Sequence, residues 1–337
     1  MKNYKPKNRL SAQNYIDGVL QGDRVILSRA ITIIESNLES DKVLAKAIIQ
    51  HILPHSGKSI RIGITGVPGV GKSTFIEAFG KYLIDQGHRV AILSIDPSSQ
   101  RSKGSILGDK TRMEDLSGME QAYIRPSASG DTLGGVANKT AESMLLCEAA
   151  GYDVILIETV GVGQSETAVH GMTDFFLLLM LAGAGDELQG IKKGIMEMAD
   201  MVVINKADGD NIRQSERARI QYQNALHIFP ESASGWSPVV TTASSTQNIG
   251  MDVVWEEISK YKLLVNENQY FETNRNRQKI NWMYDTINEE IKHLFYGSKS
   301  ISEQLPKLEQ QIISSEISPV QAAQDILERF KNTVFHS

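Results

Sequence analysis

A glycine-rich segment that ends in a lysine and a hydroxyl residue is the part of the sequence best suited to bind phosphate. Residues 66–73 read Gly-Val-Pro-Gly-Val-Gly-Lys-Ser and fit the pattern G-x-x-x-x-G-K-[ST]. The apolar run 60–64 before it predicts a buried strand, and residues 74–84 after it predict a helix with one apolar side. Backbone N–H groups and the helix dipole favour an anion at such a turn. The residues expected to contact the ligand here are Gly66, Val67, Pro68, Gly69, Val70, Gly71, Lys72, Ser73 and Thr74.

A second motif predicts which base the ligand carries. Residues Asn205-Lys-Ala-Asp208 fit N-K-x-D and follow a predicted strand. The Asp208 carboxylate can accept hydrogen bonds from N1–H and the 2-amino group of guanine, whereas adenine would leave it unpaired at a cost of about 1–3 kcal/mol. The stem of Lys206 can lie over the ring, and Asn205 can hold the neighbouring loop. The stretch after the last strand is expected to give a backbone N–H to the guanine O6 and contains Thr242, Ala243 and Ser244.

Acidic residues at the ends of strands predict a magnesium site. Asp96 and Glu158 each close an apolar run, and the carboxyl edge of an open α/β sheet is where ligands bind. Mg²⁺ prefers oxygen ligands, so the Ser73 hydroxyl, Asp96 and Glu158 are expected to hold it directly or through water. Asp109 is a third candidate, with a solvated loop position as the equal alternative. Lys72, which is expected to reach the β- and γ-phosphates, completes the set of candidate catalytic residues together with Asp96 and Glu158.

The segment after Glu158 predicts slow hydrolysis. Gly161 can place its N–H near the γ-phosphate. In many small GTPases a glutamine directly after this glycine orients the attacking water, but here Val162 follows and Gln164 comes later. We therefore expect a low intrinsic rate, or an orienting group supplied from elsewhere.

The remaining pattern predicts an α/β protein with a doubly wound, mostly parallel sheet and helical extensions at both ends. We expect a helical arm over 1–56, a nucleotide-binding domain over 57–262 and a C-terminal helical arm over 263–337. Asp23 and Asp41 are expected to cap helices in the first arm, and Ser318-Pro319 the last helix. The strands are expected at 60–64, 90–95, 154–157, 175–181, 201–204 and 239–241.

Composition narrows the class of protein. The 337 residues are 41% hydrophobic and 22% charged, which suits a globular core. A net charge of −5 argues against nucleic acid as the main partner. Cys147 is the only cysteine, which excludes an internal disulfide and suits a reducing cytoplasm. No segment reaches the ~18 apolar residues of a membrane span.

The chain resembles the MeaB/ArgK-type family of GTPases associated with methylmalonyl-CoA mutase, in the SIMIBI class of P-loop proteins. The resemblance lies in the strings GVPGVGKST, SIDPSS, GDKTRM, IRPSASGDTLGGVA, ETVGVGQSE, GAGDELQGIKKGIMEMAD and NKADGD. It implies a homodimer that binds GTP, GDP and Mg²⁺. It also implies a chaperone role toward an adenosylcobalamin-dependent acyl-CoA mutase, with gating of cofactor loading, protection of the mutase, and hydrolysis stimulated by that partner. A switch loop over 183–194 is implied, with Asp186, Gln189 and Lys192 at its polar positions.

Two other functions compete with this interpretation. A metal-delivery accessory GTPase would need soft or imidazole ligands, and seven scattered histidines with one cysteine disfavour it. A P-loop kinase for a small substrate would use ATP, which the N-K-x-D motif opposes. A non-enzymatic scaffold is weaker still, because it would not need the Lys72–Ser73 pair.

Overall fold

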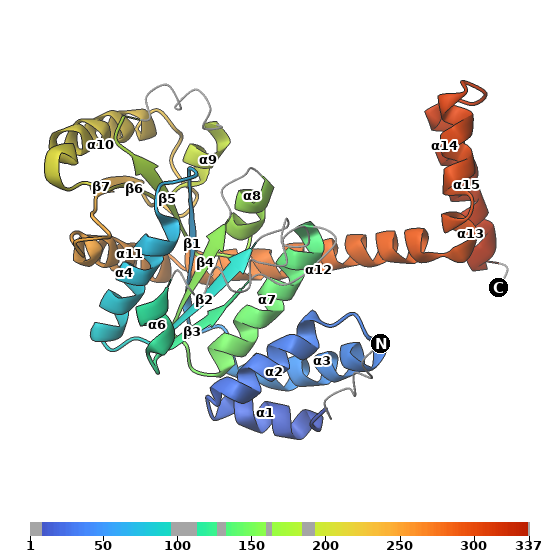
Figure 1. Ribbon diagram of the computed structural model, residues 1–337, viewed down its shortest axis with the longest axis horizontal. Coiled ribbons are helices and arrows are strands. Elements are labelled where there is room, and N and C mark those ends of the chain that lie inside the picture. Colours follow the sequence, from blue (N-terminus) through green and yellow to red (C-terminus); the bar gives the residue numbers. More distant parts are fainter. Residues whose placement is uncertain (1–8, 96–112, 127–132, 160–163, 184–192, 336–337) are drawn as a thin grey trace. The chain divides into compact units, whose positions relative to one another are not determined.

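The computed structural model describes residues 9–95, 113–126, 133–159, 164–183 and 193–335 (Figure 1). The chain forms two compact units, Met1–Gln278 and Lys279–Ser337. The first contains the sheet and every described residue of the predicted nucleotide site. The second is helical.

Seven strands of the described chain form one sheet in which all neighbouring strands are parallel. The strand order is β3-β2-β4-β1-β5-β6-β7, so the chain reverses its direction of winding beside β1. The doubly wound α/β class is therefore confirmed. The strands are β1 (Ile60–Gly66), β2 (Val90–Ile95), β3 (Ala122–Arg125), β4 (Val154–Thr159), β5 (Phe175–Leu181), β6 (Met201–Asn205) and β7 (Val239–Thr242).

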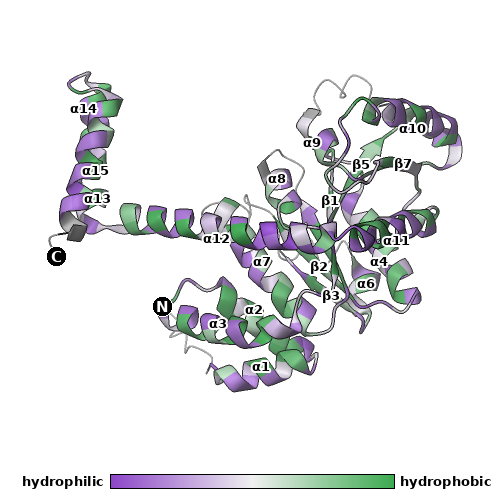
Figure 2. Cartoon of the chain, turned by 180° about the vertical axis from the view of Figure 1, so that it is seen from behind, coloured by the Kyte–Doolittle hydropathy of each residue, from purple (hydrophilic) through white to green (hydrophobic). Residues whose placement is uncertain are grey.

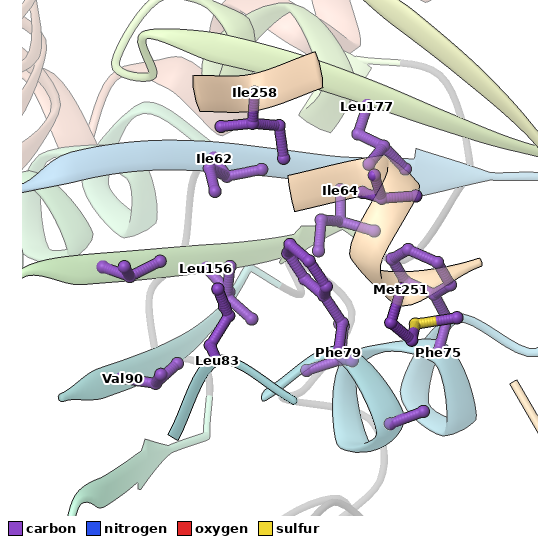
Figure 3. Packing of buried hydrophobic residues seen from close by; sticks show 14 of the residues in the cluster. Ile62, Ile64, Phe75, Phe79, Leu83, Val90, Leu156, Leu177, Met251 and Ile258 are labelled. Atoms are coloured by element: carbon purple, nitrogen blue, oxygen red, sulfur yellow. The ribbon is translucent and has the colours of Figure 1, made fainter. Parts of the chain in front are cut away.

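Alternate residues of the central strands pack against helices on one face of the sheet. Ile62 and Ile64 of β1 and Leu177 of β5 point toward α4 (Lys72–Asp85) and α11 (Met251–Glu267), as Figure 3 shows. The apolar side of α4 that meets them consists of Phe75, Ile76, Phe79 and Leu83, all buried. Short α6 (Glu114–Gly118) adds Leu116 to this core. This packing fixes the start of α4, and with it the phosphate-binding turn, against the carboxyl end of β1.

Four helices of the part of the chain that the structure describes cover the other face of the sheet. These are α7 (Leu133–Ala149), α8 (Gln164–His170), α9 (Lys193–Met198) and α10 (Ile212–Leu226). Leu178 and Met180 of β5 point to this side and pack with residues of α9 and α10. A sheet covered on both faces explains why its strands are nearly continuous apolar runs in the sequence.

Three helices, α1 (Ala12–Leu20), α2 (Arg24–Glu35) and α3 (Glu39–Ile52), pack on one another and on α7. The Asp23 carboxylate accepts hydrogen bonds from the N–H groups of Val25 and Ile26, so the predicted cap of α2 is confirmed. The predicted cap at Asp41 is wrong. Helix α3 begins at Glu39, and the buried carboxylate of Asp41 instead accepts hydrogen bonds from Nε and Nη2 of Arg9.

Strand β3 is the strand of the described sheet that was not predicted from the sequence. Its four residues, Ala-Tyr-Ile-Arg, are too few for a periodic pattern, and it lies at the edge of the sheet. Arg125 at its end forms an ion pair with Glu35 of α2 and also donates to Thr32. The edge strand is thus held by the N-terminal helices.

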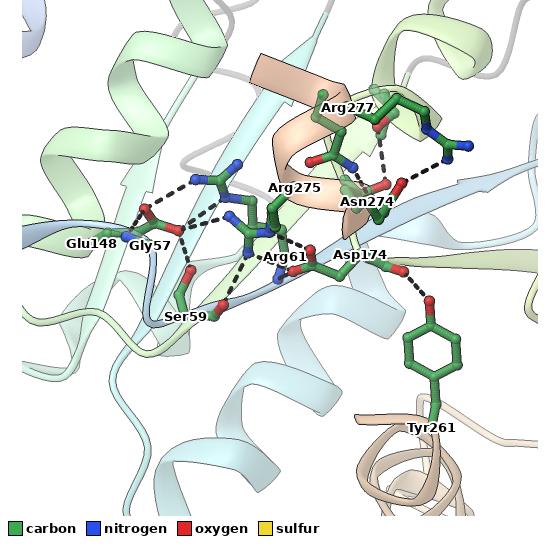
Figure 4. Close-up of polar contacts among 12 residues, drawn as sticks. Gly57, Ser59, Arg61, Glu148, Asp174, Tyr261, Asn274, Arg275 and Arg277 are labelled. Atoms are coloured by element: carbon green, nitrogen blue, oxygen red, sulfur yellow. Dashed lines mark hydrogen bonds and ion pairs between the residues drawn. The ribbon is translucent and has the colours of Figure 1, made fainter. Parts of the chain in front are cut away.

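A buried ion-pair network lies at the amino edge of the sheet, opposite the phosphate-binding turn (Figure 4). Glu148 accepts hydrogen bonds from Arg61 at 2.9 and 3.0 Å, and Asp174 accepts the Nη2 of Arg275 at 2.6 Å. Arg275 also approaches Glu148 at 3.5 Å, which joins the two pairs. Arg275 belongs to α12 (Tyr270–Gly297), so this network attaches the first turns of that helix to β1, β5 and α7.

The second unit consists of the later turns of α12 with α13 (Lys299–Ser302), α14 (Leu305–Ile313) and α15 (Pro319–Phe335). Ser318 accepts a hydrogen bond from the N–H of Gln321, which confirms the predicted cap of the last helix. The ring of Phe295 packs edge-on against Phe330. Apolar and polar residues alternate along α12 (Figure 2), and several apolar side chains beyond residue 279 are exposed, namely Ile280, Met283, Ile287, Ile291 and Leu294.

Candidate nucleotide site

The phosphate-binding turn between β1 and α4 depends on its glycines. A Cβ on Gly66 would lie 2.5 Å from the carbonyl oxygen of Leu179 in β5, so a side chain there would push the strands apart. Gly71 has φ 90° and stands directly before the first residue of α4, in a conformation that other residues rarely adopt. The turn therefore passes tightly around the N-terminus of α4, where an anion is favoured.

Lys72 is held by the turn itself. Its Nζ donates to the carbonyl oxygen of Gly66 at 2.9 Å and more weakly to that of Val67 at 3.5 Å. Burial lowers the pKa of Lys72, and the negative charges of Glu158 and Glu166 act in the opposite direction. Among the residues that the structure describes, Glu158 and Glu166 thus favour the charged form of Lys72.

Ser73 and Glu158 come together, as their types and positions predicted. The Ser73 hydroxyl donates to Oε1 of Glu158 at 3.2 Å. Parallel pairing places Glu158 opposite Ile64, two residues before the turn. Both groups offer oxygen atoms, the ligand type that Mg²⁺ prefers, so the residues present fit that ion.

Asn205 connects the two motifs. This buried side chain donates to the carbonyl oxygen of Val70 in the phosphate-binding turn at 2.9 Å. Its Oδ1 accepts the hydroxyl of Ser245 at 2.8 Å. Lys206 adds a second link, because its Nζ donates to the carbonyl oxygen of Gly69 at 2.8 Å. Asn205, which was predicted to hold a neighbouring loop, thus bonds to two loops, namely the phosphate-binding turn and the loop after β7.

Asp208 faces the loop after β7. Its carboxylate accepts the hydroxyl of Ser244 and, at 3.4 Å, that of Thr246. The N–H groups of Ala243 and Ser244 donate to the carbonyl oxygens of Ile204 and Ile249, at 2.9 and 3.0 Å. Those two N–H groups are already used within the protein. The N–H of Ser245, with a longer bond of 3.4 Å to Asn205, has more freedom to turn toward a base.

Several predicted residues lie outside the described part of the chain. They are Asp96, Asp109, Gly161, Asp186, Gln189 and Lys192, and their roles stay predictions. In the remaining residues that the structure describes, no three of the types His, Cys, Asp and Glu are grouped as a metal site would require.

Glu166 is a site residue that sequence reasoning did not single out. It stands in the first turn of α8, is only 1% exposed, and accepts the hydroxyl of Ser165 at 3.4 Å. An acidic residue at the start of a short helix resembles an ordinary favourable charge at a helix N-terminus, so its type and position did not stand out. Its burial is visible only in three dimensions.

The fold and these loops define a P-loop GTPase. Comparison with known proteins gives the family. The family model for "Methylmalonyl Co-A mutase-associated GTPase MeaB" matches residues 27–300, and the chain belongs to this family.

Its relatives support the same conclusion. The chain is 49% identical over 312 residues to a putative GTPase of Caulobacter vibrioides, which covers 93% of this chain and 95% of the relative. It is 46% identical to the GTPase ArgK of Escherichia coli over 86% of this chain and 87% of the relative. It is 43% identical to the mitochondrial methylmalonic aciduria type A homolog of Mus musculus, over 95% of this chain and 80% of the relative.

A solved structure shares the fold across nearly the whole length. The crystal structure of a LAO/AO transport system kinase matches with a TM-score of 0.76 and 36% identity, covering 97% of this chain and all of the other. The protein is thus a GTPase that binds guanine nucleotide, from a family associated with methylmalonyl-CoA mutase. None of the helices that the structure describes combines the length and apolar character needed to cross a bilayer.

Proposed function

We propose that this GTPase is a chaperone of an adenosylcobalamin-dependent acyl-CoA mutase of the methylmalonyl-CoA mutase type. It gates the loading of the cofactor and protects the mutase from inactivation, and the mutase stimulates GTP hydrolysis. The observation that carries the proposal is the match of residues 27–300 to a family named for that mutase. The matched region includes the whole sheet and all the loops of the nucleotide site.

In this proposal the site binds GTP with its phosphates at the turn before α4 and its base beside Asp208. Lys72 leaves the carbonyl oxygens of Gly66 and Val67 for the β- and γ-phosphates, which offer it full negative charge. Mg²⁺, when bound, neutralises the charge that develops on the phosphates. Ser73 and Glu158 would hold it, with Asp96 and Asp109 as further candidate ligands. Hydrolysis is slow in the isolated protein because Val162 occupies the place where many small GTPases carry the water-orienting glutamine.

The test is nucleotide-dependent coupling between two purified proteins. GTP turnover is measured for the chain alone and with methylmalonyl-CoA mutase, and binding of the two proteins is measured with GDP and with a non-hydrolysable GTP analogue. We expect slow basal turnover, stimulation by the mutase, and binding that differs between the two nucleotides. Unchanged turnover and no complex with either nucleotide contradict the chaperone role. Tight nickel or zinc binding would favour metal delivery, and phosphate transfer from ATP to a small acceptor would favour a kinase.

The Asp208→Asn variant tests the proposed recognition of guanine. The amide can donate a hydrogen bond to the 2-oxo group of xanthine, whereas the carboxylate can only accept from guanine. We expect the preference between GTP and XTP, measured by calorimetry with magnesium, to shift toward XTP by about 100-fold, because two hydrogen bonds change partners. The control is Asp210→Asn, which alters an exposed carboxylate two residues away. If Asp208→Asn keeps the wild-type preference, another group recognises the base.

We also propose a homodimer that uses the exposed apolar side of α12. Ile287, Ile291 and Leu294 are 45%, 55% and 63% exposed, and their 4-3 spacing is that of a seam between two helices. We expect Ile287→Asp to convert a dimer to a monomer in light scattering after size exclusion, because the interface would bury an unpaired charge. Asp285→Lys, on the opposite side of the helix, should leave the mass unchanged. A wild-type chain that runs as a monomer at micromolar concentration would exclude this interface.

A further inference from the structure

Ser94, near the end of β2, carries a buried hydroxyl that forms no hydrogen bond within the described part of the chain. The residue is 8% exposed, and its Oγ is among the buried side-chain atoms without a partner. A hydroxyl that is removed from water and left unpaired costs free energy, so native proteins rarely keep one without a reason. The position of Ser94 in the sheet supplies such a reason.

Parallel pairing places Ser94 beside a residue of the nucleotide site. Ser94 lies opposite Glu158 of β4, and Glu158 in turn lies opposite Ile64 of β1. Neighbouring strands of a sheet are only about 4.8 Å apart, which is within reach of a hydroxyl and a carboxylate that share a face. Ser94 is therefore the neighbour of Glu158 on the side away from the phosphate-binding turn.

The side chains of Ser94 and Glu158 share the face of the sheet that α4 covers. Val90 of β2 and Leu156 of β4 pack together with α4 in one apolar cluster (Figure 3). Because side chains alternate between the two faces of a strand, Ser94 lies on the same face as Val90, and Glu158 on the same face as Leu156. The first turn of α4 carries Ser73, whose hydroxyl donates to Glu158 at 3.2 Å. Three oxygen-bearing side chains thus gather on this face at the carboxyl edge of the sheet.

We propose that Ser94 is a positioning residue of the magnesium site, which donates its hydroxyl hydrogen to the Glu158 carboxylate and so directs that carboxylate toward the ion. The inference rests on the proposed binding of Mg²⁺ by Ser73 and Glu158. An ionised carboxylate can accept about four hydrogen bonds, so the bond from Ser73 leaves room on Glu158 for a second donor. Donors of this kind fix the orientation of a metal-binding side chain and strengthen its hold on the metal. The bond from Ser94 is not formed in the structure, so the proposal requires the carboxylate to turn when Mg²⁺ binds with the nucleotide.

This role gives loss of the hydroxyl two opposite effects. In the nucleotide-free chain, Ser94→Ala removes a buried polar atom that lacks a partner, so the thermal midpoint should rise by about 2–3 °C. With nucleotide and Mg²⁺, the same change removes a hydrogen bond to a metal-binding carboxylate, so the ion should add less to the affinity for the nucleotide. A serine that only packs within the sheet would change the thermal midpoint alone.

The experiment measures, by calorimetry, the Kd for a non-hydrolysable GTP analogue with Mg²⁺ and with EDTA. The ratio of the two values reports what the ion contributes. For Ser94→Ala we expect this ratio to fall about tenfold, while the Kd in EDTA stays within about twofold of the wild-type value.

The matched control is Ser215→Ala in α10, on the other face of the sheet. Ser215 is fully buried, and its hydroxyl also forms no hydrogen bond with the residues that the structure describes. Its replacement should raise the thermal midpoint as Ser94→Ala does, but it should leave the ratio unchanged.

A double variant tests whether Ser94 acts through Glu158. In a chain that already carries Glu158→Gln, Ser94→Ala should lower the ratio by less than about twofold, because changes to two residues of one interaction are not additive. Equal losses in the presence and absence of Glu158→Gln would show that Ser94 does not act through this carboxylate.

Two further results would overturn the proposal. One is a ratio for Ser94→Ala equal to that of the wild type, which would refute the role of Ser94 and leave the magnesium site standing. The other is a loss of affinity for the analogue that is the same with Mg²⁺ and with EDTA, which would make Ser94 a structural residue only. A wild-type chain that binds the analogue equally well in both conditions would instead refute the magnesium site itself, and the role of Ser94 with it.

Discussion

Replacement of Lys72 by alanine is expected to lower the affinity for GTP by at least about 100-fold, or about 2.7 kcal/mol. Two effects combine. The ligand loses charge-assisted hydrogen bonds to its phosphates, which are among the strongest contacts that a protein can offer. The variant also leaves Glu158 and Glu166 without the positive charge that offsets them, so the site repels phosphate. Calorimetry with GTP and magnesium measures the change.

The matched control lies on the same helix. Lys81 of α4 is a surface lysine that pairs with Asp115 at 2.8 Å, and Lys81→Ala should leave the affinity for GTP within about twofold of wild type. Unaltered affinity in Lys72→Ala would mean that the turn before α4 does not bind the phosphates. A large loss in Lys81→Ala as well would point to damage to the helix rather than to the site.

Replacement of Arg275 by methionine is expected to destabilise the first unit by about 3–5 kcal/mol. Methionine approximates the volume of the stem but leaves Asp174 and Glu148 buried with less positive charge between them. The two carboxylate side chains are 2% and 1% exposed, so water cannot replace the lost partner. Urea denaturation followed by circular dichroism measures the free energy of unfolding. Arg277→Met, which alters an exposed arginine bonded to Asn274, should cost less than about 1 kcal/mol.

The same network makes stability depend on acid. Burial acts to raise the pKa of Glu148, but the ion pairs with Arg61 and Arg275 outweigh it and lower the pKa below its usual value. A lowered pKa in the folded state contributes stability at neutral pH, and this contribution is lost as the pH falls below about 4.5 toward the folded value. Arg275→Met removes part of the lowering, so its acid unfolding should begin at a higher pH than that of the wild type. Coincident acid transitions would show that Arg275 contributes little to the charge state of Glu148.

The sequence predicted those elements of the structure that depend on neighbouring residues in the chain. Six strands are apolar runs because both faces of the sheet are covered, and the turn before α4 is a short continuous motif. Strand β3 escaped prediction because four residues carry no period. The Asp41 cap was wrong because the arginine that takes its carboxylate is 32 residues away, and no local pattern reveals such a partner.

Contacts between distant residues account for the rest. Arg61 stands in an apolar run, and its partner Glu148 is 87 residues away, while Arg275 and Asp174 are 101 residues apart. Each of these charges alone resembles a surface residue. Glu166 could not be recognised for the same reason, because only its burial distinguishes it from an acid at the start of a solvated helix. The sequence motifs therefore predicted where the nucleotide site lies, whereas the buried charged residues around the sheet became apparent only in the structure.

The position of Asn205 has a consequence for how the two ends of the nucleotide are sensed. Its amide donates to the carbonyl oxygen of Val70 in the phosphate-binding turn and accepts from the hydroxyl of Ser245 in the loop after β7. A movement of either segment should therefore move the other. The binding free energies of pyrophosphate and of the nucleoside, measured separately, should therefore not add up to the binding free energy of the intact nucleotide. Binding of the purine should therefore affect the position of the phosphate-binding turn, and Asn205 shares this coupling with Lys206, which donates to the carbonyl oxygen of Gly69.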